Sequence, residues 1–186
     1  MKPVEELRME HEAVKLTLRV LEEICRRMER HGDPGVGNAV TQLLEFFSVF
    51  VDKCHHGKEE ELLFPALEQV GVKVEGGPIG VLLKEHQQGR ECVQRMSKSF
   101  SAHRPGEPGT SVDFNRDARE YVALLGLHIE KENNVLFPLA ERELSEAKQA
   151  ELSDGFERIE NEKIGVGRHE QFHLMLDNLK GLYLHP

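Results

Sequence analysis

Apolar residues recur every three or four positions along four long segments of this sequence, and this spacing most constrains how the chain can fold. The segments cover about residues 3 to 30, 38 to 69, 78 to 102 and 112 to 142. Stretches rich in proline and glycine ("HGDPGVG", "GVKVEGGP" and "HRPGEPGTS") separate them. Such spacing puts apolar side chains on one face of a helix, and proline and glycine end helices. The sequence therefore predicts four amphipathic helices.

Composition agrees with an all-α class. Only 6% of the residues are aromatic and 31% are charged, which suits amphipathic helices better than β-sandwiches. Four long helices with short connections pack most simply as an antiparallel up-down four-helix bundle. We expect one domain over residues 1 to 186, with the bundle at about 3 to 143 and a helical extension at about 144 to 186. The extension should form two helices divided by "IGVG".

The net charge of −9 argues against nucleic acid or an anionic membrane as partner, because both bind clustered Lys and Arg. The sequence has no signal peptide and no run of about 18 apolar residues, so no membrane span is predicted. Cys25, Cys54 and Cys92 are too scattered for a disulfide framework and are expected to be buried thiols. These features predict a cytoplasmic protein.

Polar residues interrupt all four apolar series. His11 stands in the first, His55 and Glu59 in the second, His86 in the third, and His128 and Glu132 in the fourth. Residues 55–68 also align without gaps on residues 128–141, so the pattern is an internal duplication. The lone His precedes the paired His by 44 residues in one half and by 42 in the other. We expect two hairpins related by an approximate two-fold axis.

Two further His and Glu pairs have the same spacing but do not lie on the inward face of a predicted helix. His56 with Glu60 is rotated about 100° from the apolar stripe, and His103 with Glu107 lies in a Pro/Gly loop. His56, Glu60 and Glu61 are therefore predicted to face water.

Residues four apart share a helix face, so the six inward residues should converge inside the bundle. Burying two carboxylates without cations is costly, and we expect no Lys or Arg on the inward lines. Six ligands exceed the needs of one tetrahedral zinc, whereas two ions bridged by two carboxylates use all six. Mixed nitrogen and oxygen ligands suit iron, with manganese or zinc as substitutes. The alternative is a set of core histidines without metal.

The runs "CHHGKEEELLFPALE", "GGPIGVLLKEHQQGR" and "HIEKENNVLFPLAERELS" resemble the bacterial hemerythrin-like HHE cation-binding family over about residues 5 to 142. The resemblance implies a four-helix bundle with an oxo- or hydroxo-bridged non-heme di-iron site. It implies six ligands, namely His11, His55, Glu59, His86, His128 and Glu132, with the two glutamates as bridges. Oxygen-carrying hemerythrins use more histidines, so the set departs from that of a reversible carrier.

Several nearby residues have two interpretations. Tyr121 could hydrogen-bond or coordinate at the iron site, or could pack in the core with its hydroxyl reaching a loop. His169 could cap or gate the site, or could simply pack in the last helix. Glu85 and Glu130 could hold imidazole N–H groups, although their helical phase favours the surface. Pro65 and Pro138 should kink or end their helices beyond the metal layer.

The leading hypothesis is a di-iron protein that binds or reduces dioxygen, nitric oxide or a peroxide, with an unidentified electron donor, as a monomer or small homo-oligomer. One alternative is iron storage or delivery, as in iron–sulfur centre repair proteins. Another is a redox or oxygen sensing module that signals through its last two helices. Whether the protein is an enzyme stays open.

Overall fold

The computed structural model describes residues 2–31, 35–102 and 111–184, and these residues form helices and turns without any strand. The all-α class is confirmed. The predicted loop pair His103 and Glu107 lies outside the described residues. The long elements are α1 (Pro3–His31), α2 (Gly37–Phe46), α4 (Pro78–Ala102) and α5 (Val112–Lys131).

The second and fourth predicted helices are not α-helical throughout. Three π-helical stretches occur: η1 (Phe47–His56), η2 (Glu59–Leu63) and η3 (Glu132–Leu136). Short α-helices follow them, α3 (Phe64–Gln69) and α6 (Phe137–Glu143), each with its proline in the first turn. Proline lacks the N–H that the carbonyl four residues earlier needs, and a wider π turn ahead of it accommodates that loss. The helices thus continue past Pro65 and Pro138 instead of ending there.

The π turns also change which side chains face inward. The apolar spacing of the fourth segment continues through Val135, but Val135 is 51% exposed and Leu136 is fully buried. Similarly, Leu139 is only half buried and Ala140 is buried. A π turn holds more residues than the 3.6 of an α turn, so the inward positions move one residue along the chain.

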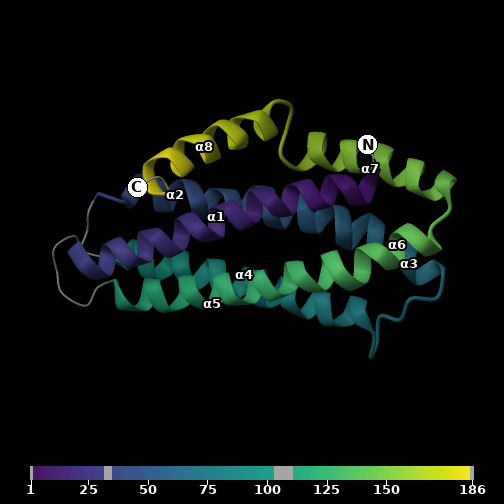
Figure 1. Ribbon diagram of the computed structural model, residues 1–186, viewed down its shortest axis with the longest axis horizontal. Coiled ribbons are helices and arrows are strands. Elements are labelled where there is room, and N and C mark those ends of the chain that lie inside the picture. Colours follow the sequence, from purple (N-terminus) through teal and green to yellow (C-terminus); the bar gives the residue numbers. More distant parts are fainter. Residues whose placement is uncertain (1, 32–34, 103–110, 185–186) are drawn as a thin grey trace.

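The helical segments lie lengthwise beside one another, with α4 against α5 and α1 against α5 (Figure 1). Their apolar side chains form two clusters toward opposite ends. On α1, Leu7 belongs to one cluster and Val14 to the other, with His11 between them. The polar residues therefore form a layer between two apolar cores, which keeps the layer away from bulk water.

The last two helices, α7 (Glu146–Lys163) and α8 (Arg168–Tyr183), lie along one side of α1, as Figure 1 shows. Gly165 and Gly167, with φ of 89° and 79°, make the predicted division between them. Phe156 of α7 and Phe172 of α8 pack into the two clusters. Among the described residues, no helix is both long and apolar enough to cross a bilayer.

Candidate metal centre

The structure brings the six residues predicted as ligands into one buried cluster. Ligand atoms of His11, His55, Glu59 and Glu132 lie within 4.8 Å of one another, and so do those of Glu59, His86 and His128 together with His56. Each of the six predicted residues is at most 2% exposed. Glu59 belongs to both groups, so the two groups share a carboxylate.

The Nε2 atoms of the histidines face the two carboxylates. The Nε2 atoms of His11 and His128 lie 3.1 and 3.2 Å from Glu132 oxygens, and that of His86 lies 3.4 Å from Glu59 Oε2. Nevertheless, all four carboxylate oxygens and Nε2 of His11 lack a hydrogen bond of acceptable geometry. Buried polar atoms are normally satisfied. The lone pairs of these oxygen and nitrogen atoms therefore point into a common space, where a bound cation would satisfy them.

The outward Nδ1 atoms are held instead by oxygen acceptors. The pairs are His11 with Asn133 (3.0 Å), His55 with Glu10 (2.7 Å), His86 with Glu60 (2.7 Å) and His128 with Glu85 (3.0 Å). An Nδ1–H that donates outward leaves the Nε2 lone pair pointing inward, which is the tautomer that a metal ligand needs. The prediction that Glu85 faces the surface is wrong, whereas Glu130 is exposed as expected.

Cationic side chains stand behind three of these acceptors. Lys58 Nζ lies 2.5 Å from Glu10, Arg90 lies 2.5 Å from Glu60, and Lys131 donates to Glu85. Lys58 is completely buried, which corrects the expectation that no Lys or Arg would point inward. Its further partners are Glu6 and Glu160 rather than the central glutamates. Among the described residues, Glu59 and Glu132 have no ion pair with Lys or Arg.

The central carboxylates attract positive charge strongly. Burial alone would raise the pKa of Glu132, but His128 and the other facing imidazoles lower it well below its usual value. Burial alone would lower the pKa of His128, yet Glu132 and Glu85 raise it to about 9. The pKa of His86 is likewise raised, by Glu132, Glu59 and Glu60, against the effect of burial. The field that draws protons onto these rings would also favour metal cations.

The donor set fits a pair of metal ions. It offers imidazole nitrogens and carboxylate oxygens, a mixture that suits iron, manganese or zinc. Four outer acceptors fix the rings. Glu59 belongs to both groups of possible ligands, and Glu132 lies within 3.2 Å of His11 and His128. The residues present therefore fit the two-ion site that the sequence predicted.

His56 is the residue that sequence reasoning missed. It is 3% exposed rather than solvated, and its ring stacks on that of His86 with centroids 3.8 Å apart. It lies in η1, where the wider π turn places it inward. Glu60 is only half buried and Glu61 is exposed, so the solvent prediction holds for Glu61. Unlike the other histidines of the cluster, His56 has no hydrogen-bond partner at either ring nitrogen.

Tyr121 and His169 lie outside the ligand groups. Tyr121 is 2% exposed and packs against Phe47, with ring centroids 4.8 Å apart. His169 Nδ1 lies 3.1 Å from Glu160, which in turn is 3.5 Å from Lys58. His169 is thus connected to the cluster through a series of ion pairs, and its ring also stacks on that of Phe50.

The cysteines are buried and free, as predicted. Burial raises the pKa of Cys54, the neighbour of His55, to about 12. The thiol is therefore protonated at neutral pH and is not an activated nucleophile.

The fold and this site define a helical protein built to hold metal ions between paired histidines and glutamates. The sequence matches the hemerythrin HHE cation binding domain over residues 2–140, and the chain belongs to that family.

Named relatives vary in what is known of them. The chain is 26% identical over 161 residues to an uncharacterized protein of Mycobacterium tuberculosis, a match that covers 87% of this chain and 62% of the relative. It is 33% identical over 120 residues to the iron-sulfur cluster repair protein YtfE of Salmonella typhimurium, covering 61% of this chain and 53% of that protein. A namesake in Escherichia coli is 30% identical over 118 residues. The chain thus spans half to six tenths of the length of these curated relatives.

Proposed function

We propose that this chain is a di-iron protein that binds or reduces a small oxidant or gas, within an antiparallel four-helix bundle at residues 3–143. One observation carries the proposal. The inward Nε2 atoms surround two carboxylates that lack hydrogen bonds, while every outward Nδ1 of the predicted ligands is tied to an acceptor. The buried free cysteines also favour the cytoplasm, where thiols stay reduced.

Each protein group has a distinct part in this proposal. His11, His55, His86 and His128 would hold the ions through Nε2, and Glu59 and Glu132 would bridge them. Two iron ions held there would supply redox chemistry and open coordination positions for dioxygen, nitric oxide or a peroxide. The apolar clusters on both sides exclude water from the layer. Glu10, Glu60 and Glu85 keep the imidazoles oriented by accepting from Nδ1–H.

The experiment begins with protein purified without air, whose iron content and ultraviolet–visible spectrum are measured. Two iron ions per chain are expected, and dioxygen, nitric oxide or hydrogen peroxide should change the charge-transfer absorption within the mixing time. A spectrum that responds to none of the three would rule out small-ligand chemistry. Folded protein that never takes up metal would rule out the site itself.

Iron delivery or iron–sulfur centre repair is the second candidate, and the similarity to YtfE favours it. The discriminating measurement is iron transfer from the loaded protein to an apo iron–sulfur protein. Restored absorption of the acceptor, with matching loss of iron from this chain, would support delivery. Retained iron and a fast response to gas would support the leading proposal.

A sensing role has one structural observation in its favour. Glu160 of α7 contacts Lys58, which binds Glu10, the acceptor for His55. Binding of metal or ligand at the site would therefore change the contacts of the C-terminal helices. Hydrogen exchange of α7 and α8 with and without iron tests this, and equal protection in both states would contradict it.

A further inference from the structure

Apolar side chains are exposed around a pocket in the duplicated half that begins with α4. The pocket, of about 200 Å³, is lined by Pro78, Val81, Leu82, Lys131, Val135 and Leu136. Val81 and Val135 are 47% and 51% exposed, and Leu127, one turn before Lys131 on α5, is 66% exposed. We call Val81, Leu127, Lys131 and Val135 the Lys131 patch. Single exposed apolar residues are ordinary, but a group of them around a pocket is typical of a contact surface.

The Lys131 patch has a counterpart in the first half. Four pairs of residues correspond: Leu127 with Cys54, Lys131 with Lys58, Val135 with Leu62, and Val81 with Glu6. The first three pairs follow from the ungapped alignment of residues 55–68 on residues 128–141 and its extension by one residue. The fourth follows from alignment of the two lone histidines. In the counterpart Cys54 is 1% exposed and Lys58 is completely buried, so the halves differ in what lies over this surface.

Helix α7 covers the counterpart in the first half, and Figure 1 shows it beside α1, with α5 along the opposite edge of the view. The ring of Phe156 lies 5.6 Å from Lys58 Nζ, and Glu160, one turn later, lies 3.5 Å from the same atom. Gly155 is so close to Leu62 that an added Cβ would lie 2.7 Å from the leucine Cδ1. A small residue, an aromatic residue and an acid one turn later thus hold an amphipathic helix on this surface.

Lys131 has fewer acidic partners than its counterpart. Lys58 pairs with Glu6, Glu10 and Glu160. Within the residues that the structure describes, Lys131 pairs with Glu85 alone. Val81 occupies the position of Glu6, so the second half supplies an apolar side chain where the first half supplies a carboxylate. A further carboxylate near Lys131 would have to come from another molecule.

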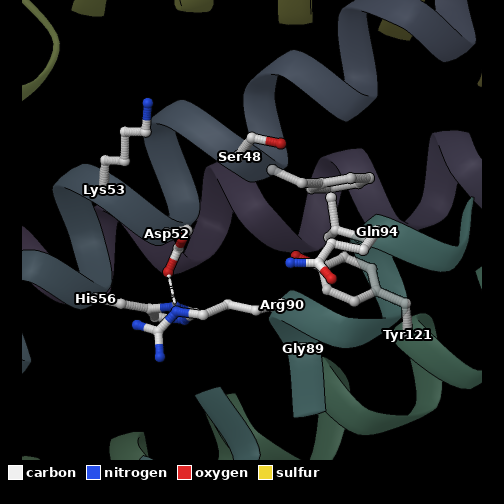
Figure 2. A pocket seen from close by; sticks show the side chains of 10 residues that line it. Ser48, Asp52, Lys53, His56, Gly89, Arg90, Gln94 and Tyr121 are labelled. Atoms are coloured by element: carbon white, nitrogen blue, oxygen red, sulfur yellow. Dashed lines mark hydrogen bonds and ion pairs between the residues drawn. The ribbon is translucent and has the colours of Figure 1, made fainter. Parts of the chain in front are cut away.

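Basic residues beside a pocket are not always available to a partner. Arg90, on the rim of the pocket in Figure 2, is held by Asp52 at 2.7 Å and by Glu60 at 2.5 Å. The side chain of Lys131 is 45% exposed beside its one carboxylate, and Lys84 on α4 is exposed as well. The Lys131 patch therefore offers positive charge next to apolar surface, which suits an acidic and amphipathic partner.

We propose that the Lys131 patch is the docking site for an acidic amphipathic helix of a partner protein. The helix places one large apolar side chain in the pocket and a carboxylate, one turn later, on Lys131. A cavity of about 150 Å³ accommodates benzene, so a pocket of about 200 Å³ accommodates one aromatic side chain. Helix α7 has the same features, with six acidic and three basic residues and Phe156 one turn before Glu160. The proposal concerns the protein surface and not the metal, so it goes beyond the proposed function.

The probe is a synthetic peptide of residues 145–164, which contains α7 and its N-cap Ser145. It is titrated into the intact nitrogen-15-labelled protein, whose own α7 covers the first half. We expect a dissociation constant of about 1 mM or tighter, because a short helix loses part of its binding energy to folding. The amide shifts of Val81, Leu127 and Val135 should change most, and a scrambled peptide should not change them. No shift at these residues, or shifts centred on α1 or η1, would overturn the proposal.

Two substitutions test the contacts. Leu127→Glu replaces an exposed apolar residue by an acid and should weaken peptide binding about tenfold. Val166→Glu, at a position 89% exposed and outside the patch, should leave the affinity unchanged. In the peptide, Phe156→Ala should weaken binding to a similar extent without altering the protein. Equal affinities of the parent and Leu127→Glu, or of the two peptides, would contradict the assignment.

Sedimentation equilibrium tests a second copy of this chain as the occupant. Leu127→Glu should leave the molar mass of the protein in solution unchanged. A parent dimer that Leu127→Glu converts to a monomer would overturn the proposal, because the patch would then be a contact between two copies.

Discussion

The two duplicated halves place their ligands in the same way but surround them differently. In the first half Glu10 precedes the lone His11, accepts from His55 and is held by Lys58. In the second half Glu85 precedes the lone His86, accepts from His128 and is held by Lys131. Lys58 and Lys131 align in the duplication, yet one is fully buried while the other side chain is 45% exposed.

The C-terminal helices cause this asymmetry. Phe156 of α7 lies 5.6 Å from Lys58 Nζ and Glu160 lies 3.5 Å from it, so α7 covers the first half. Within the described part of the chain, Lys131 has no comparable cover and its side chain is 45% exposed. The comparison teaches that the duplication fixes the positions of the ligands. The C-terminal extension decides which of the two aligned lysines is shielded from water. Variants at matched positions can test each part of this statement.

The largest effect is expected where the halves should behave alike. Glu59→Gln and Glu132→Gln each remove a bridging charge, and both variants should lose iron because an amide is a poor ligand for it. Metal analysis of purified protein measures this, with Glu61→Gln, exposed on the same helix as Glu59, as control. If only one of the two central variants lost iron, the halves would not share a centre.

The second largest effect is a loss of stability that should differ between the two halves. Lys58→Met leaves the buried Glu10 without its cation, which typically costs about 3–5 kcal/mol. Lys131→Met breaks a half-exposed pair and should cost less than about 1 kcal/mol. The free energies of unfolding in urea measure both. Equal losses would mean that cover by α7 does not matter.

Much of this arrangement could be predicted from the sequence. Spacing alone placed His11 and His86 on inward faces, because the long α-helices α1 and α4 keep their phase over several turns. The spacing of the two His and Glu pairs also gave the inward side, although His55, Glu59 and Glu132 lie in π-helical stretches. The duplication also carried a signal for the outer residues. Glu10 and Glu85 both stand directly before a lone His, and this repeat could have indicated that Glu85 has a role inside.

Two features could not be derived from helical phase. His56 faces inward in η1, which is π-helical, so a prediction that assumed 3.6 residues per turn placed it on the wrong face. Part of the cover over the buried Lys58 comes from Phe156, 98 positions later in the sequence. A contact of that separation leaves no periodic pattern near the lysine.

A smaller effect concerns the acceptors behind the ligands. Glu10→Gln and Glu85→Gln should each lower iron affinity about 10- to 100-fold, as loss of an outer partner usually does. Glu10→Gln should lower iron affinity more than Glu85→Gln does. Lys58 is fully buried against Glu10, and the substitution removes one of the negative charges that this buried lysine needs. Competition with a chelator measures both affinities. A greater loss for Glu85→Gln would reverse the proposed order of the halves.

The smallest effect lies at the outer end of the ion pairs. The hydrogen bond to Glu160 raises the pKa of His169 above 6.5, with Glu10 also raising it and Lys58 opposing, and the same hydrogen bond lowers the pKa of Glu160 below 4.5. A raised histidine pKa contributes stability that is complete below pH 6.5 and is lost as pH rises through the raised value. A lowered glutamate pKa contributes stability above pH 4.5 that is lost as pH falls through the lowered value.

The pair therefore stabilises the protein fully between about pH 4.5 and 6.5. Its contribution should stay below about 1 kcal/mol because both side chains are partly exposed. His169→Gln should flatten the fall in melting temperature above pH 6.5. A parallel fall in the parent and His169→Gln would show that the pair between His169 and Glu160 does not help to hold α8. The asymmetry between the halves would then come entirely from α7.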